Sequence, residues 1–146
     1  MKRLKNERGY TLIEMLIVLF VVMTLTAIVT KFSLKIVEAK EIERFFNQIQ
    51  LDLQFIQTYS MQHNEYIFMH FESPSQRYSI KKDFYTTLYT RPFPQGVELL
   101  LSRSNILTIS YNFKGNVMTP GTLYFKTPQG TKKVVISLGR GRSRVE

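Results

Sequence analysis

The stretch RGYTLIEMLIVLFVVMTLTAIVT, residues 8–30, decides the fold of this chain. Residues 11–30 contain one charged side chain, Glu14, and a helix of about 20 apolar residues spans roughly 30 Å, the thickness of the hydrocarbon layer of a membrane. We therefore predict a single transmembrane helix over about residues 11–30. Residues 1–9 contain four basic residues and one acidic residue, so the positive-inside rule predicts a cytoplasmic N-terminus and a C-terminal part outside the cell.

Glu14 is the unusual residue of this stretch. Insertion scales assign a cost of about 2.5–3.5 kcal/mol to Asp, Lys or Arg at the centre of a spanning helix. Ionisable residues in such helices are usually retained for a partner or a pathway. Because Glu14 lies near one end of the stretch, its carboxylate could instead simply reach the lipid headgroups, and this alternative stays open on the residue alone.

Gly9, Tyr10 and Glu14 form a motif with a defined spacing. Gly9 follows the basic run KRLKNER, Tyr10 comes next, and Glu14 is the fifth residue counted from Tyr10. The segment resembles the class III signal of type IV prepilins and pseudopilins, although Tyr10 stands where that family usually has Phe. The resemblance implies that a prepilin peptidase cuts after Gly9, removes the basic leader of residues 1–9 and methylates the new amine of Tyr10.

The resemblance also implies a role for Glu14 in assembly. A carboxylate and an amine that are both buried in a low-dielectric environment stabilise each other, whereas an unpaired buried charge is costly. In the family, this pairing sets the register of subunits that enter a helical filament. The implied partners are other major and minor pseudopilins, an assembly ATPase and an inner-membrane platform protein.

Two other accounts of the N-terminal stretch are possible. An ordinary secretory signal has an apolar region of about 7–15 residues and a small-residue cleavage site. Here the apolar region is longer, and Thr24-Leu25-Thr26 before Ala27 is a poor cleavage site. A plain single-pass membrane protein is the other account, and it predicts no cleavage at Gly9.

A helical period continues beyond Thr30. Apolar or small residues recur at intervals of three or four, at Ile36, Ala39, Ile42, Phe46, Ile49, Leu53, Ile56 and Ser60. This spacing is one face of an amphipathic helix, and no Gly or Pro interrupts residues 10–73. We predict one helix over residues 10–63, whose first half lies in the membrane and whose second half packs on a head.

Residues 64–146 consist of short β-rich runs separated by turn signals. The predicted strands are 65–72, 77–81, 84–90, 97–101, 106–113, 122–126 and 132–138. Turns are expected at 73–75, 114–116 and 128–130, which contain Pro or Gly. Short antiparallel strands over a long helix make an α+β fold. With the N-terminal resemblance, we expect a pilin-like architecture with a β-rich globular head and a basic C-terminal tail.

The last part of the chain carries a second resemblance. The order Asn112-Phe113-Lys114-Gly115, then GTLYF at 121–125, then VISLGRG at 135–141 resembles the C-terminal hairpin of GspH-like minor pseudopilins. That group includes the D-type (ComGD-like) minor pseudopilin of Gram-positive competence operons. The resemblance implies a minor rather than a major subunit, and a competence system rather than a secretion system.

The composition points away from catalysis. The 146-residue chain has no cysteine, which excludes disulfides, thiol nucleophiles and zinc–thiolate sites. The two histidines, His63 and His70, have no recognised metal-ligand spacing. We therefore expect no enzyme, no metal site and no cofactor, and structural roles for both histidines.

Basic residues gather near the C-terminus. The chain carries a net charge of +9, and loss of residues 1–9, which carry +3, would leave +6. Arg140, Arg142 and Arg144 alternate in the tail, so in an extended strand they would point to one side. Together with Lys132 and Lys133 they are candidate contacts for DNA or another polyanion. A solvated basic terminus that binds wall polymer or keeps the head soluble is the alternative.

The chain contains eight Tyr and eleven Phe. Phe45, Phe46 and Phe55 lie on or near the apolar stripe of the helix, and Phe84, Tyr85, Tyr89 and Phe93 follow in and after a predicted strand. Packing in the core or between subunits is the expected role. Stacking of bases on exposed rings beside Arg91 is the alternative.

Taken together, the residues and the two resemblances predict a structural minor pseudopilin of a competence pseudopilus that takes up DNA for natural transformation. It would start as a single-pass protein of the cell membrane and then join a filament at the cell surface. The alternatives are a minor pseudopilin of a type II secretion or other type IV pilus system, and an adapter at the filament tip that binds DNA directly.

Overall fold

The computed structural model describes residues 10–83, 85–139 and 142–146, with residues 31–34 described without their side chains. The predicted leader 1–9 with its Gly9, the predicted contact Arg140, and Phe84 lie outside the described residues. The chain forms two compact units, residues 1–37 and residues 38–146. We describe each unit by itself.

One helix, α1, runs over Leu12–His63. It starts with a cap, because the backbone N–H of Glu14 donates to the hydroxyl of Thr11 at 3.4 Å and to its carbonyl at 3.1 Å. It ends with Asn64 in the left-handed region, at φ 53°. The N–H of Glu65 reaches back to the carbonyl of Ser60 at 3.2 Å, which is the bond of a Schellman cap. The helix thus ends where the apolar period of the sequence ends.

In the first unit, the helix presents apolar side chains that no other described part of the chain covers. By length and composition α1 is the one described helix that could cross a membrane, and the apolar window is not buried inside the protein. The hydroxyls of Thr24, Thr26 and Thr30 each donate to a carbonyl three or four residues earlier, at 2.7–2.8 Å. Their polar groups are therefore satisfied without water, as an apolar environment requires.

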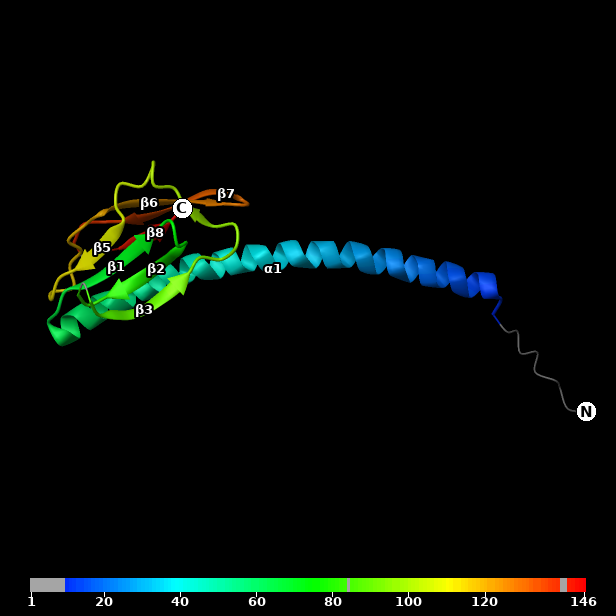
Figure 1. The fold of residues 1–146 in the computed structure, drawn as a ribbon, viewed down its shortest axis with the longest axis horizontal. Coiled ribbons are helices and arrows are strands. Elements are labelled where there is room, and N and C mark those ends of the chain that lie inside the picture. Colours follow the sequence, from blue (N-terminus) through cyan, green and yellow to red (C-terminus); the bar gives the residue numbers. More distant parts are fainter. Residues whose placement is uncertain (1–9, 84, 140–141) are drawn as a thin grey trace, which may run out of the picture. The chain divides into compact units, whose positions relative to one another are not determined.

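The second unit contains two antiparallel four-stranded sheets (Figure 1). The first has the order β3-β2-β1-β5, formed by Thr87–Pro92, Arg77–Lys81, Ile67–Glu72 and Thr108–Tyr111. The second has the order β4-β6-β7-β8, formed by Glu98–Leu99, Gly121–Thr127, Gly130–Ile136 and Ser143–Val145. Val117 forms single antiparallel bridges with Tyr111 of β5 and with Gly139, which follows β7.

The α+β, pilin-like fold expected from the sequence is confirmed, with differences in individual strands. The strand expected at 84–90 begins later, at Thr87, because Asp83 accepts hydrogen bonds from the N–H groups of Tyr85 and Thr86 at 2.8 and 2.6 Å and so closes a turn. The strand expected at 97–101 is reduced to Glu98–Leu99. The tail, for which a strand and an extended segment were both open, forms β8.

The core of the head lies between α1 and the two sheets. From α1, the stripe expected from the sequence is buried at Ile42, Phe46, Ile49, Leu53, Ile56 and Ser60. Its first two members differ, because Ile36 is 57% exposed and Ala39 is half-buried. Phe125 of β6 is fully buried and its ring lies 5.5–6.0 Å from four other rings, those of Phe45, Phe46, Phe71 and Phe93. Aromatic contacts of this kind add to the stability from buried area.

Two leucines of α1 provide a matched test of this packing. Leu53 is 1% exposed, whereas Leu51 is 58% exposed. Leu53→Ala should lower the free energy of unfolding by about 3–5 kcal/mol, because it removes buried methyl groups and leaves a cavity. Leu51→Ala should change it by less than about 0.5 kcal/mol. Urea denaturation of the chain in detergent micelles measures both, and equal effects would contradict the orientation of α1.

Candidate functional site

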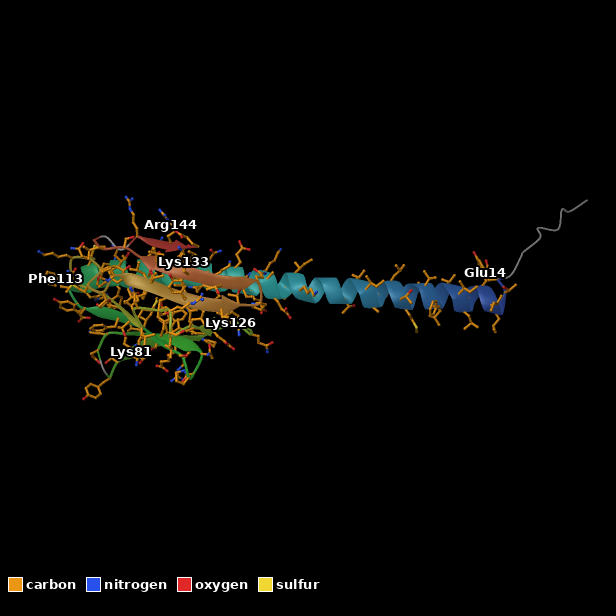
Figure 2. All side chains as sticks on the ribbon, turned by 90° about the horizontal axis from the view of Figure 1, so that it is seen from above. Glu14, Lys81, Phe113, Lys126, Lys133 and Arg144 are labelled. Carbon is orange, nitrogen blue, oxygen red and sulfur yellow. The ribbon has the colours of Figure 1, made fainter. Side chains whose placement is uncertain are left out.

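Tyr10 and Glu14 lie at the start of α1 (Figure 2 labels Glu14). Tyr10 precedes the helix and is 76% exposed, and Glu14 lies in the first turn. A negative charge in the first turn interacts favourably with the helix dipole. No described residue forms an ion pair with the Glu14 carboxylate. Glu14 thus lies four residues after Tyr10, whose amine a cleavage after Gly9 would expose. Gly9 itself is outside the described residues.

One of the predicted basic contacts, Lys132, lies apart from the others that the structure describes. Lys132 is opposite Phe125 in the β6–β7 register, and its ammonium lies 5.2 Å from the centre of the Phe46 ring. Lys133, the next residue, points to the other side of the sheet, as neighbouring residues of a strand do. Four of the five predicted contacts are described. Lys133 and Arg144 lie on one face of the second sheet, because Arg144 is opposite Val135 in the β7–β8 register, and Lys132 lies on the other.

The side-chain carboxylate of Glu146 offsets part of the positive charge of the predicted basic contacts. Glu146 forms ion pairs with Lys133 at 2.7 Å and with Arg144 at 3.6 Å; Figure 2 labels Lys133 and Arg144. The hydrogen bond between them lowers the pKa of Glu146 and raises that of Lys133. Arg142 is exposed and has no ion-pair partner among the described residues. Of the predicted polyanion contacts that the structure describes, Arg142 is thus the one most accessible to an anionic partner.

A buried polar cluster joins α1 to the first sheet. Asp52 of α1 is 3% exposed. Its carboxylate accepts hydrogen bonds from the hydroxyl of Tyr78 at 2.6 Å, from Nε of Arg91 at 2.9 Å and from Nε2 of Gln48 at 2.8 Å. The ion pair with Arg91 offsets the cost of burying the Asp52 charge. One carboxylate thereby connects the helix to both β2 and β3.

The cluster shifts the ionisation of its partners. Burial and the bond to Asp52 raise the pKa of Tyr78 far above its ordinary value, and burial together with the Asp52 charge raises the pKa of Tyr89 to about 12. Burial disfavours the charge of Arg91, but the Asp52 carboxylate outweighs it, so the pKa of Arg91 lies above its ordinary value. Both tyrosines therefore remain neutral at physiological pH.

Sequence reasoning missed Asp52. A signal was available, because position 52 lies between Ile49, Leu53 and Ile56 on the side of the helix that faces the core. A charge at such a position requires a buried partner. The identity of that partner depended on the β2–β3 pairing, in which Tyr78 is opposite Arg91.

The aromatic residues mostly pack within the head. Phe45 and Phe93 are buried, and Phe55, which is 43% exposed, pairs with the ring of Tyr89 at 5.9 Å. Arg91, the expected neighbour of stacked bases, lies over the Tyr89 ring at 5.0 Å and binds Asp52. Tyr85, 98% exposed, is the clear exception.

The histidines make ordinary structural contacts. His63 stacks on Tyr59 with ring centres 4.1 Å apart, and Nδ1 of His70 lies 2.7 Å from the hydroxyl of Thr108. Within the residues that the structure describes, no three His, Cys, Asp or Glu side chains are grouped so that they could hold a metal ion.

Comparisons with known proteins agree with this architecture. Residues 4–30 match the prokaryotic N-terminal methylation motif. The type IV minor pilin FimU of Pseudomonas aeruginosa PAO1 superposes with a TM-score of 0.59 at 13% identity, covering 75% of this chain and 90% of FimU. The fold is pilin-like. A second crystal form of FimU gives a TM-score of 0.52 at 13% identity, covering 68% of this chain and 88% of FimU. The curated proteins include no match.

The methylation motif gives the N-terminal residues their context within this pilin-like fold. The motif covers residues 4–9 of the basic leader, including Gly9, then Tyr10, Glu14 and the apolar stretch as far as residue 30. Its match supports processing by a prepilin peptidase and assembly with other pilins. It also supports a membrane-anchored start for the pilin-like chain.

The importance of Asp52 to the head can be measured. Asp52→Ala should lower the free energy of unfolding by about 1.5–3 kcal/mol, because Tyr78 and Arg91 lose a charged hydrogen-bond acceptor. Glu98→Ala removes the exposed ion pair with Lys126, which has a 3.9 Å separation, and should cost less than about 1 kcal/mol. Thermal and urea unfolding of the chain in micelles compare the two. A loss for Asp52→Ala no larger than that for Glu98→Ala would contradict the assigned role.

Proposed function

We propose that this chain is a minor subunit of a type IV-like filament. The observation that carries the proposal is the combination of the N-terminal methylation motif, with Glu14 in the first turn of α1, and a pilin-like head on the same chain. The motif supplies the means of processing and assembly. The head supplies a surface for contacts with neighbouring subunits. The contribution of the chain is therefore structural rather than catalytic.

Each part of the N-terminus has a defined task in this proposal. A prepilin peptidase cuts after Gly9 and methylates the amine of Tyr10. The apolar part of α1 leaves the membrane and enters the filament core, where its exposed side chains become buried against those of other subunits. Glu14 then pairs with the terminal amine of a neighbouring subunit, because an unpaired carboxylate in that core would be costly.

We further propose that the filament is a competence pseudopilus that brings in DNA for transformation. Support comes from the C-terminal order of residues 112–115, 121–125 and 135–141, which resembles the hairpin of GspH-like minor pseudopilins of competence operons. The likeness to FimU concerns a pilus subunit, so another type IV pilus system is one alternative. A type II secretion pseudopilus is the other. The three systems share the subunit role and differ in what the filament moves.

Replacement of Glu14 tests the role of the subunit. Glu14→Val should leave membrane insertion and peptidase-dependent processing unchanged, because the cleavage site and the apolar stretch are intact. The intact mass of the wild-type chain and that of Glu14→Val should both show the loss of residues 1–9 and the gain of one methyl group. Incorporation into sheared filaments should be lost, and uptake of transforming DNA should fall with it while protein secretion continues.

Glu38→Val is the matched control, since Glu38 is an exposed carboxylate of α1 outside the apolar stretch. It should assemble normally. Normal assembly of Glu14→Val would contradict the register role of Glu14. An unprocessed wild-type mass in the presence of the peptidase would contradict the subunit role itself, and a secretion defect with normal DNA uptake would favour a secretion system.

Direct capture of DNA by the head is a second candidate function, favoured by Arg142, which is exposed and forms no ion pair with any described residue. Replacing Lys132, Lys133, Arg140, Arg142 and Arg144 by Gln should weaken binding of the chain to duplex DNA. The log–log dependence on salt should become flatter by about 0.9 for each lost phosphate contact. Because Glu146 already pairs with Lys133 and Arg144, Arg142→Gln alone should weaken binding more than Lys133→Gln or Arg144→Gln alone. Fluorescence anisotropy from 50 to 200 mM salt measures this, and unchanged binding at low salt would exclude direct capture.

A further inference from the structure

A polar groove runs between α1 and the C-terminal strand of the head. It has a volume of about 720 Å³. One wall is formed by glutamines one turn apart on α1, Gln50, Gln54 and Gln57, and the other by β8 with the neighbouring part of β7. All of these residues belong to the second unit. The groove involves neither Glu14 nor the apolar half of α1, so the proposed assembly step leaves it unused.

The β8 wall is an open sheet edge. In the antiparallel β7–β8 pair, Glu146 and Lys133 exchange both backbone hydrogen bonds, at 2.7 and 2.9 Å, and the N–H of Ser137 donates to the carbonyl of Arg142 at 3.2 Å. The residues between, Ser143 and Val145, are therefore non-hydrogen-bonded positions, whose backbone groups point away from β7. No described residue pairs with these outward groups. Such an edge is a template for another extended chain.

The α1 wall complements that edge. The amides of Gln50 and Gln54 make no side-chain hydrogen bond with any described residue, and an amide both donates and accepts. The lining also contains two cations, Arg142 and Arg144, and one carboxylate, that of Glu146. Glu146 pairs with Arg144 and with Lys133, which lies outside the lining. The groove therefore offers unpaired hydrogen-bonding groups on both sides and an excess of positive charge.

We propose that this groove binds an extended acidic segment of a neighbouring filament subunit, which adds to the second sheet as a strand beside β8. An extended polypeptide fits the free edge of β8, because its backbone N–H and C=O groups can pair with those of Ser143 and Val145 at the spacing of a sheet. Its acidic side chains pair with Arg142 and Arg144. A nucleic acid strand fits less well, since the described lining of the groove contains no aromatic ring on which bases could stack.

This inference rests on the proposed function, because the partner is another subunit of the same filament. It adds a contact of a different kind from the packing of apolar helices in the filament core. Strand addition is directional and requires a free edge, so β8 can accept one segment at a time. The groove would thereby select which sibling lies beside this subunit.

Photo-crosslinking in the native cell tests the proposal. A benzoylphenylalanine is placed at position 54, in the groove, or at position 55, where Phe55 lies outside its lining. Illumination should link position 54 to an acidic, extended segment of another filament subunit, mapped by mass spectrometry. Val145→Pro removes an outward N–H without removing a bond to β7 and should abolish that crosslink. Val145→Thr keeps the N–H and should preserve it.

A charge reversal gives a second variant that does not alter the backbone. Arg142→Glu should abolish the crosslink at position 54. Lys126→Glu should not, because Lys126 belongs to β6 and lies outside the lining of the groove. The crosslinks of position 55 should be unaffected by all four substitutions. Filament incorporation is measured in the same cells, so failure of the subunit role is seen separately.

A crosslink of position 54 that survives Val145→Pro and Arg142→Glu would overturn strand addition. A crosslink only to nucleic acid, or none in a chain that is present in filaments, would overturn it as well.

Discussion

The arrangement of the first sheet against α1 depends on the hydrogen bonds that the Asp52 carboxylate accepts from Tyr78 and Arg91. This carboxylate is the one charge of the helix's core-facing side that the described structure buries, and it accepts bonds from β2 and β3 at once. Hydrophobic packing alone would hold the sheet on the helix, but it is non-directional and would allow small shifts along the stripe. A carboxylate with two fixed donors allows one register, because a shift of one residue would leave a buried charge unpaired.

The two halves of α1 have different surfaces. Up to about residue 30 its surface is apolar on nearly all sides and exposed, whereas from Ile42 to Ser60 an apolar stripe is buried in the head and most of the opposite face is polar. A helix that is apolar all round is stable only when it is surrounded by lipid or by other apolar helices. The change of pattern within one uninterrupted helix therefore separates the part that must be covered by other molecules from the part that the chain covers itself.

The sequence predicted those features that depend on local periodicity. The stripe from Ile42 to Ser60, the end of α1 near His63 and a strand in every expected β-rich run follow from spacing and turn residues. Features that depend on pairing between distant segments could not be predicted. Arg91 reaches Asp52 only because β3 pairs with β2. Lys132 and Lys133 are neighbours in the sequence and both candidate polyanion contacts, but the strand alternation sends Lys132 toward Phe46 and Lys133 toward Glu146.

The tail shows how a small pairing difference changes the meaning of a charge pattern. As an extended segment, Arg142 and Arg144 would form a basic strip, and DNA would be its natural partner. As strand β8 the same residues have their backbone groups bound to β7, while Ser143 and Val145 face outward between them. The charges then flank an open sheet edge instead of standing alone. The chemistry of an edge is the recognition of another backbone, so the formation of β8 turns a general attraction for anions into a surface that can distinguish one extended chain from another.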